Sequence, residues 1–270
     1  MKRISFLPVL FIILCVAGAK AQNLDLYQKR LFISKADTLP YRILYPENFD
    51  PGKKYPVMLF LHGRGESGKD NQKQLTHGGK MFLRDSIRSR HSAIVIFPQC
   101  PADSYWANVN IVTDSSGKRH FNFIEGGEPT LAMQMLLDFT NDFLRNPFVD
   151  KRRVYVGGLS MGGMGTFEIL RRKDKTFAAS FAICGGDHIA NVKKYRRVPL
   201  WVFHGGKDDV VPPKHSEVVV NEMKKLGGSV RYTHYANANH NSWDPAFAEP
   251  GLLNWLFSHE KKSWLRRLFN

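Results

Sequence analysis

Short apolar segments recur along this chain and alternate with longer segments of helical periodicity. Apolar residues at helical spacing mark 129–144, 162–172, 213–226 and 252–268. Uniformly apolar runs occur at 56–61, 93–97 and 154–157, and the segments 178–184, 200–204 and 230–235 continue this series of strands. An early strand over 39–45 precedes them, and we expect it at an antiparallel edge. Strands buried on both faces by helices form continuous apolar runs. The alternation therefore predicts an α/β fold with a mostly parallel central sheet and helices on both faces.

One serine stands among glycines where an apolar strand pattern passes into a helical pattern. The residues VYVGGLSMGG (154–163) contain Gly158, Ser160 and Gly162 in the pattern G-x-S-x-G. A sharp strand-to-helix turn requires neighbours without side chains, because the two backbone arms pass close together. Such a turn presents the serine hydroxyl at the positive end of the following helix. We interpret Ser160 as the nucleophile of an elbow, with helix capping as its alternative role.

An acid and a base follow this serine at the places where a serine nucleophile needs them. A serine hydroxyl is a weak nucleophile at neutral pH, so it needs a base that a third group orients. Asp208 follows the strand over 200–204, and His240 lies in the loop after the strand over 230–235. Open α/β sheets place their sites at the carboxyl ends of strands. We therefore predict a catalytic triad of Ser160, Asp208 and His240.

Other residues compete for the roles of acid and base. Asp209 is the alternative acid, and His234, His215 and His204 are the alternative bases. His234 falls within a strand and His215 on a helix, whereas His62 and His204 precede glycines at strand ends, where histidines are typically structural hydrogen-bonding groups. A zinc site of His234 and His240 lacks a cysteine or acidic ligand pattern. We expect no metal and no cofactor.

A glycine-rich segment after an early strand could complete an oxyanion hole. One donor is normally the backbone N–H after the nucleophile, which here belongs to Met161. The other comes from the loop in LFLHGRGESG (59–68), where we favour the N–H of Arg64 and keep Gly63 and Gly65 as alternatives. This loop lacks the lysine placement of a phosphate-binding loop.

The start of the chain differs from the rest. A basic beginning and an apolar stretch over 4–18 precede small residues at Ala19 and Ala21. This pattern predicts a signal peptide over 1–21 and one domain over 22–270, with an uncleaved anchor as the alternative. The apolar stretch is shorter than the ~20 residues of a spanning helix. We expect an exported protein, periplasmic or secreted, without stable membrane insertion after cleavage.

Charge and cysteine content limit the partners. The net charge of +15 falls to +12 when the three basic residues of the leader are removed. The basic clusters over 193–197 and 261–267 indicate solvated faces, and no nucleic-acid motif is present, so we expect no nucleic-acid partner. Cys100 and Cys184 could pair in an exported protein, although their strands are expected to lie apart. The long irregular segment over 98–128 is expected to form a wall of the binding site.

Six segments spread along the chain match motifs of one known family. They are LHGRGESGKDN (61–71), FPQCP and YW (97–106), DKRRVYVGGLSMGGMGTFE (150–168), CGG (184–186), FHGGKDDVVP (203–212) and NHNSWDPAF (239–247). Taken together, these segments resemble the α/β-hydrolase fold carboxylesterases, including esterase D/feruloyl-esterase-like and polyhydroxybutyrate-depolymerase-like proteins. The resemblance implies the α/β-hydrolase fold and the triad and oxyanion residues above, and it places Trp106 and Trp243 near the acyl or alcohol pocket.

The sequence thus supports one main hypothesis and two alternatives. The main hypothesis is an exported serine esterase acting on small-molecule or polysaccharide-linked esters, with acetyl or feruloyl groups as candidate acyl groups. A serine peptidase of the prolyl-oligopeptidase-like type uses the same triad. A non-catalytic hydrolase-fold binding module would use the basic surface for an anionic ligand. Acyl specificity and oligomeric state are left open by the sequence.

Overall fold

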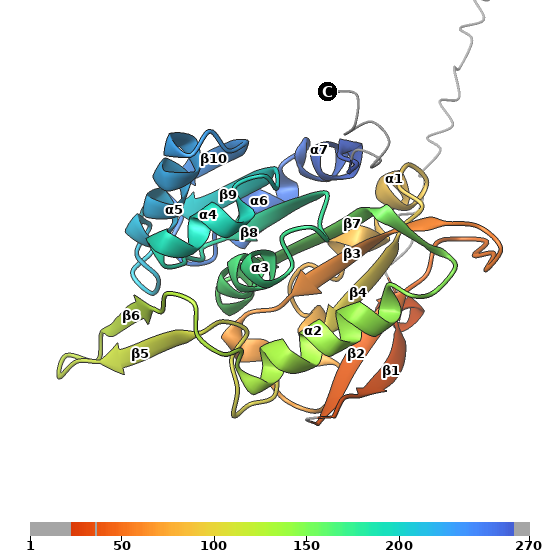
Figure 1. Cartoon of the computed structure of the whole chain (residues 1–270), viewed down its shortest axis with the longest axis horizontal. Coiled ribbons are helices and arrows are strands. Elements are labelled where there is room, and N and C mark those ends of the chain that lie inside the picture. Colours follow the sequence, from red (N-terminus) through yellow and green to blue (C-terminus); the bar gives the residue numbers. More distant parts are fainter. Residues whose placement is uncertain (1–22, 36, 262–270) are drawn as a thin grey trace, which may run out of the picture.

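A twisted sheet of eight strands forms the centre of the molecule (Figure 1). The computed structural model describes residues 23–35 and 37–261. The strand order is β1-β2-β4-β3-β7-β8-β9-β10; β1–β2 and β2–β4 are antiparallel and the other pairs are parallel. The strands are β1 (Gln28–Ile33), β2 (Thr38–Leu44), β3 (Tyr55–Leu61), β4 (Ile94–Pro98), β7 (Val149–Leu159), β8 (Ala179–Ile183), β9 (Leu200–Gly205) and β10 (Val230–Tyr235). The predicted mostly parallel sheet is confirmed.

Helices cover both faces of this sheet, because side chains along each strand point alternately to opposite faces. In β3, Val57 and Leu59 belong to the core beneath α2 to α5, whereas Met58 and Phe60 belong to the core beneath α6 and α7. The helices are α1 (Asp85–Arg88), α2 (Leu131–Phe143), α3 (Met161–Arg172), α4 (Val192–Tyr195), α5 (Lys214–Lys225), α6 (Trp243–Ala248) and α7 (Leu252–Ser258), with short 3-10 helices at Leu24–Leu26, Arg64–Glu66, Lys73–Leu75, Met81–Leu83 and Ile189–Asn191. Within the described residues, none of these helices has the length and apolar character needed to cross a membrane.

One edge of the sheet differs from the sequence-based expectation. The strand predicted over 39–45 is antiparallel, as expected, but it is not the edge, because β1 pairs along its full length from Gln28↔Ile43 to Ile33↔Thr38. Most residues of β1 are exposed, so this strand lacks the apolar pattern that marks the buried strands.

The segment over 98–128 contains a β-hairpin rather than irregular chain alone. Strands β5 (Val109–Thr113) and β6 (Arg119–Phe123) pair antiparallel and extend from the body as a two-stranded arm (Figure 1). The side chain of Asp114 accepts hydrogen bonds from the backbone N–H groups of Ser116 and Lys118, at 2.9 and 3.1 Å, and so closes the turn. Phe121 in β6 packs in a small apolar cluster with Met164 and Val211, which lie next to the candidate site.

Two further predictions concern the ends of the chain. The signal peptide predicted over 1–21 lies outside the described residues. The last predicted helix, 252–268, ends as α7 at Ser258, and its part beyond 261 also lies outside the described residues.

Candidate active site

Ser160 occupies a strained turn between β7 and α3. Its backbone has φ 53° and ψ −117°, a left-handed conformation that costs a residue with a side chain roughly 1–3 kcal/mol. The neighbouring glycines explain how the turn is packed. A Cβ atom on Gly162 would lie 1.9 Å from the carbonyl oxygen of Leu61, and one on Gly158 would lie 2.5 Å from the same oxygen. The elbow therefore rests backbone against backbone on the end of β3, and only glycine fits at these positions.

The three residues predicted as a triad lie in one hydrogen-bonded series. Ser160 Oγ is 2.9 Å from His240 Nε2, and His240 Nδ1 is 2.8 Å from Asp208 Oδ2. Because a carboxylate only accepts, Nδ1–H donates to Asp208, which leaves Nε2 free to accept the Ser160 proton. The competing Asp209 is exposed, and His215 packs instead against the rings of Phe121 and Phe123 in the hairpin.

Asp208 is buried but well supplied with donors. Its Oδ1 accepts hydrogen bonds from the backbone N–H groups of Val210 and Val211, at 3.0 and 2.8 Å. Its Oδ2 faces His204 Nε2 at 3.2 Å as well as His240. Burial acts to raise the pKa of Asp208, but the hydrogen bonds from His204 and His240 outweigh it and hold the pKa well below its usual range. Asp208 is therefore an ionised carboxylate that can orient and stabilise a protonated His240.

His204 is a contact of this carboxylate that the sequence reasoning did not foresee. We predicted only that a histidine before a glycine at a strand end makes structural hydrogen bonds. Its ring is fully buried, with Nδ1 2.7 Å from Ser216 Oγ and Nε2 2.8 Å from the carbonyl oxygen of Val211. The spacing His204 to Asp208 places the ring directly after β9 and beside the carboxylate, so the only available signal was this four-residue separation.

The loop after β3 lies against Ser160. A Cβ atom on Gly63 would be 3.7 Å from the Ser160 Cβ. The exposed side chain of Arg64 donates hydrogen bonds to the carbonyl oxygens of Ala102 and Ser104, at 2.6 and 2.8 Å, which ties this loop to the segment before the hairpin. Met161 is the first residue of α3, where an N–H has no acceptor within its own helix. The oxyanion role of the Met161 and Arg64 N–H groups remains a prediction.

The two tryptophans implied by the resemblance occupy different environments. Trp243 packs nearly perpendicular to the His240 ring, with centroids 5.4 Å apart, and so borders the hydrogen-bonded series. Trp106 is completely buried, 5.6 Å from the His62 ring, and its indole nitrogen has no hydrogen-bond partner among the described residues. Contact with substrate remains a prediction for both.

A polar pair that the sequence did not mark lies beside the glycine-rich loop. Glu66 Oε1 is 3.7 Å from His77 Nε2, and the His77 ring in turn packs on Trp243 with centroids 5.1 Å apart. Burial raises the pKa of Glu66 although the neighbouring His77 acts to lower it. Through Trp243, which also packs on His240, this pair is linked to the hydrogen-bonded series.

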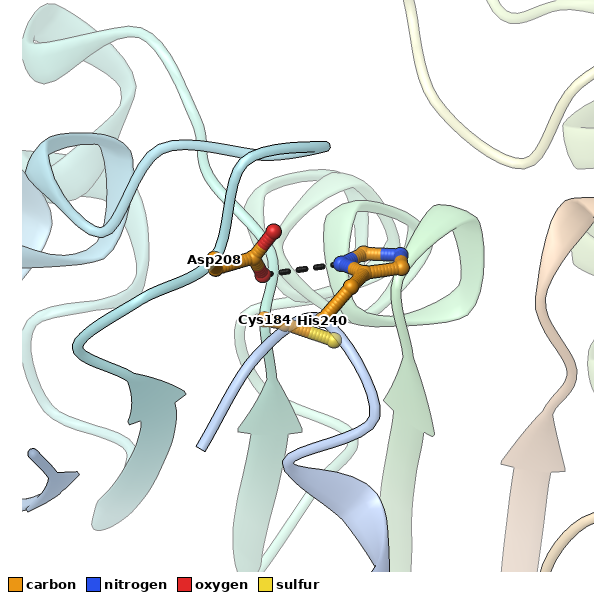
Figure 2. A group of neighbouring side chains, drawn as sticks. All are labelled: Cys184, Asp208 and His240. Atoms are coloured by element: carbon orange, nitrogen blue, oxygen red, sulfur yellow. Dashed lines mark hydrogen bonds and ion pairs between the residues drawn. The ribbon is translucent and has the colours of Figure 1, made fainter. Parts of the chain in front are cut away.

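Cys184 is the remaining reactive group near the series, as Figure 2 shows. One potential ligand atom of Cys184, one of Asp208 and one of His240 all lie within 4.8 Å of one another. Burial, with the negative charge of Asp208, raises the pKa of the Cys184 thiol well above its usual range. A neutral thiol is a weak metal ligand and nucleophile, and the His240 ring already bonds to Asp208, so this group fits hydrogen bonding better than metal binding. Cys100 and Cys184 are both buried free thiols, so neither is in a disulfide.

Comparison with known proteins places this geometry in context. The phospholipase/carboxylesterase family matches residues 50–249. Lysophospholipase-like protein 1 of Mus musculus is 26% identical over 199 residues, which cover 70% of this chain and 81% of that protein. The bifunctional acetylxylan esterase/xylanase XynS20E of Neocallimastix patriciarum is 26% identical over 167 residues, covering 62% of this chain but 21% of that protein. A thermostable esterase of known structure superposes with a TM-score of 0.77 at 30% identity, covering 88% of this chain and 64% of that chain. The predicted α/β-hydrolase fold and the resemblance to carboxylesterases are confirmed.

Proposed function

Because the chain belongs to the phospholipase/carboxylesterase family and is a carboxylic ester hydrolase, we propose that it cleaves esters through an acyl group carried on Ser160. The observation that carries the proposal is the hydrogen-bonded series from Ser160 Oγ through His240 to Asp208, at 2.9 and 2.8 Å. It begins at a residue whose backbone is held in a strained turn. Strain of this kind persists where the surrounding structure fixes the residue, and it is concentrated at functional sites.

The geometry supports a two-step reaction. Ser160 Oγ attacks the ester carbonyl while its proton passes to His240 Nε2, and His240 then gives that proton to the departing alcohol. Asp208 stabilises the imidazolium through Nδ1–H. A water molecule, deprotonated by His240 in the same way, attacks the acyl carbon. The bond from the acyl carbon to Ser160 Oγ then breaks, the acid is released, and His240 returns the proton to Ser160 Oγ. The N–H groups of Met161 and Arg64 would hold the oxyanion that forms in both steps.

The substrate class is an ester of a carbohydrate polymer or of a related small molecule. The similarity to an acetylxylan esterase supports this class. A wide, open depression of about 560 Å³ beside the glycine-rich loop supports it as well, because its walls combine polar groups with one aromatic ring, that of Tyr105. Arg64, Asp103 and Tyr105 lie on this wall. Acetyl and feruloyl groups are the acyl groups to test, and export by the predicted signal peptide would bring the enzyme to such polymers.

Substitution of Ser160 tests the proposal. We expect the variant Ser160→Ala to lose hydrolysis of p-nitrophenyl acetate, methyl ferulate and acetylated xylan by at least about 10³-fold while it keeps the circular dichroism of the wild type. Cys184→Ala is the matched control, because it removes the other nucleophilic atom of the cluster; it should retain most of the activity. Ester turnover that survives in Ser160→Ala would refute the mechanism.

The same assays distinguish the alternatives. A fluorogenic dipeptide substrate that turns over faster than the esters would favour a serine peptidase. A folded wild-type protein that hydrolyses none of these substrates would favour the non-catalytic binding module.

A further inference from the structure

A hollow of about 630 Å³ opens at the amino-terminal ends of β8 and β9, whereas the candidate active site lies beyond their carboxyl ends. Its walls include Ala178, directly before β8, and Pro199, directly before β9. The candidate site instead follows the carboxyl ends of these strands, at Cys184 and Asp208. The strands have five and six residues, and at ~3.3 Å per residue they hold the two places roughly 17–20 Å apart. The hollow is therefore separate from the ester-cleaving machinery.

Exposed cations surround this hollow. Five exposed basic side chains line it, and Lys261 adds a partly buried sixth. The exposed five are Lys175, Lys193, Lys194, Arg196 and Arg197. We call these residues, with the hollow that they line, the basic hollow.

Little negative charge balances these cations. The two acids of the lining are Asp174 and Glu260, and Glu260 is paired with Arg152 outside the hollow. Within the described part of the chain, no ion pair involves any of the five exposed cations. The sequence outside the described ranges contains no aspartate or glutamate. Like charges at this density repel one another, and a bound polyanion would remove that repulsion.

The shape and composition of the hollow restrict the kind of anion. Its apolar members Phe177, Ala178 and Val198 are buried, and Pro199 and the ring of His259 are partly buried. Most of the exposed groups of the lining are therefore the cations. Proteins that bind a membrane surface insert exposed apolar side chains, and sites for single-stranded nucleic acid present exposed aromatic rings for stacking. The described lining has no fully exposed apolar residue and no exposed phenylalanine, tyrosine or tryptophan ring. A concave cationic site without stacking groups fits a hydrophilic chain that carries regularly spaced anionic groups.

We propose that the basic hollow binds a segment of acidic polysaccharide, with uronate carboxylates paired to Lys193, Lys194, Arg196 and Arg197. Binding there would hold a polymer on the enzyme while an ester borne by the same or a neighbouring chain reaches Ser160. The site is independent of the proposed chemistry, because none of its residues contacts Ser160, His240 or Asp208. It also gives a role to the basic cluster over 193–197, which the sequence alone indicates only as a solvated face.

The test compares two variants that lose the same charge. One carries K193Q, K194Q, R196Q and R197Q; the control carries K29Q, K35Q, K54Q and K80Q, which removes four exposed lysines elsewhere. The probe is a fluorescent decamer of galacturonic acid, with affinity measured by anisotropy at 50 and 150 mM NaCl. We expect at least tenfold weaker binding at 50 mM for the basic-hollow variant and less than twofold for the control. For the basic-hollow variant, the slope of log Kd against log[NaCl] should be smaller than that of the wild type by roughly two to four.

Two further measurements make the test decisive. Turnover of p-nitrophenyl acetate should stay within twofold of wild type in both variants, which shows that each is folded and that the ester site is separate. The double variant R196Q/R197Q should give an intermediate loss of binding. Equal losses in the basic-hollow variant and the control would overturn the proposal. So would wild-type protein that ignores the decamer but binds phosphatidylglycerol vesicles or single-stranded DNA. A wild type that lacks ester turnover would refute the proposed function but leave the binding result intact.

Discussion

We expect the buried carboxyl group of Asp187 to lower the stability of this fold at neutral pH, so that its removal stabilises the protein. The side chain is buried after β8, where it accepts hydrogen bonds from the backbone N–H of His188 at 2.7 Å, from Asn191 Nδ2 at 2.8 Å and from the Tyr195 hydroxyl at 3.0 Å. Burial raises the pKa of Asp187 from 3.8 to about 6, although these hydrogen bonds act to lower it. Asn191 also bonds to the carbonyl oxygen of Ile124, which ties this loop to the base of the hairpin.

The sign and size of the effect follow from the two pKa values. As pH rises above about 4, Asp187 loses its proton in the unfolded chain but keeps it in the folded protein until about pH 6. The folded state thus binds more protons over this interval, and stability falls as pH rises through it. A shift of about two pKa units corresponds to a loss of up to roughly 3 kcal/mol above pH 6. Below pH 4 the loss is absent.

The variant Asp187→Asn isolates this contribution. An asparagine keeps Oδ1 for His188 and Asn191 and can donate from Nδ2 to the Tyr195 hydroxyl oxygen, but it cannot ionise. Urea denaturation followed by tryptophan fluorescence at pH 4.5 and 7.5 should show the variant more stable by up to roughly 3 kcal/mol at the higher pH, with most of this difference gone at the lower pH. Asp209→Asn, which removes an exposed carboxylate, is the control and should change the free energy of unfolding by less than about 0.5 kcal/mol at both pH values. A difference between wild type and Asp187→Asn that is the same at both pH values would refute the reasoning.

Three more predictions concern the ester site. Ser160→Gly should abolish ester turnover, as we expect of Ser160→Ala. Its free energy of unfolding should nevertheless be about 1 kcal/mol higher than that of Ser160→Ala, because glycine adopts φ 53° without strain. Equal urea midpoints would contradict this. Asp208→Asn should lower kcat by about 10³–10⁴-fold with little change in KM, because an amide cannot hold the His240 ring in the required tautomer; a loss confined to KM would argue against the role of Asp208. Gly162→Ala should lower the free energy of unfolding by more than about 3 kcal/mol, because its Cβ would lie 1.9 Å from Leu61 O. Gly65→Ala, whose Cβ would meet nothing within 4 Å, should lower it by less than about 1 kcal/mol. Similar urea midpoints for the two variants would show that the elbow tolerates a side chain.

The sheet and the candidate triad could be predicted because their signals are local in the sequence. Each buried parallel strand is a continuous apolar run, and Ser160 and Asp208 each follow such a run, whereas His240 follows the partly exposed strand β10. Parallel strands bring their carboxyl ends to one edge, so local patterns were enough to place distant residues together. The structure then supplied the distances that join them.

The elements that the sequence did not reveal depend on pairing between distant segments. Most of β1 is exposed, and this strand is defined by its backbone bonds to β2 rather than by an apolar pattern. In the hairpin, Phe121 is the one buried residue of its two strands, so β5 and β6 also lack an apolar period. The contact of Glu66 with His77 depends on how the long loop after β3 folds back on itself, and the contact of His204 with Asp208 was signalled only by their four-residue separation.

Labelling with a fluorophosphonate probe tests the central claim most directly. The purified protein would be treated with the probe, and its intact mass and peptide map would locate any adduct. The account predicts one adduct, on Ser160, in the wild type and in Cys184→Ala, and none in Ser160→Ala. An adduct on another residue, or a folded wild-type protein that takes up no probe, would contradict the assignment of Ser160 as the nucleophile.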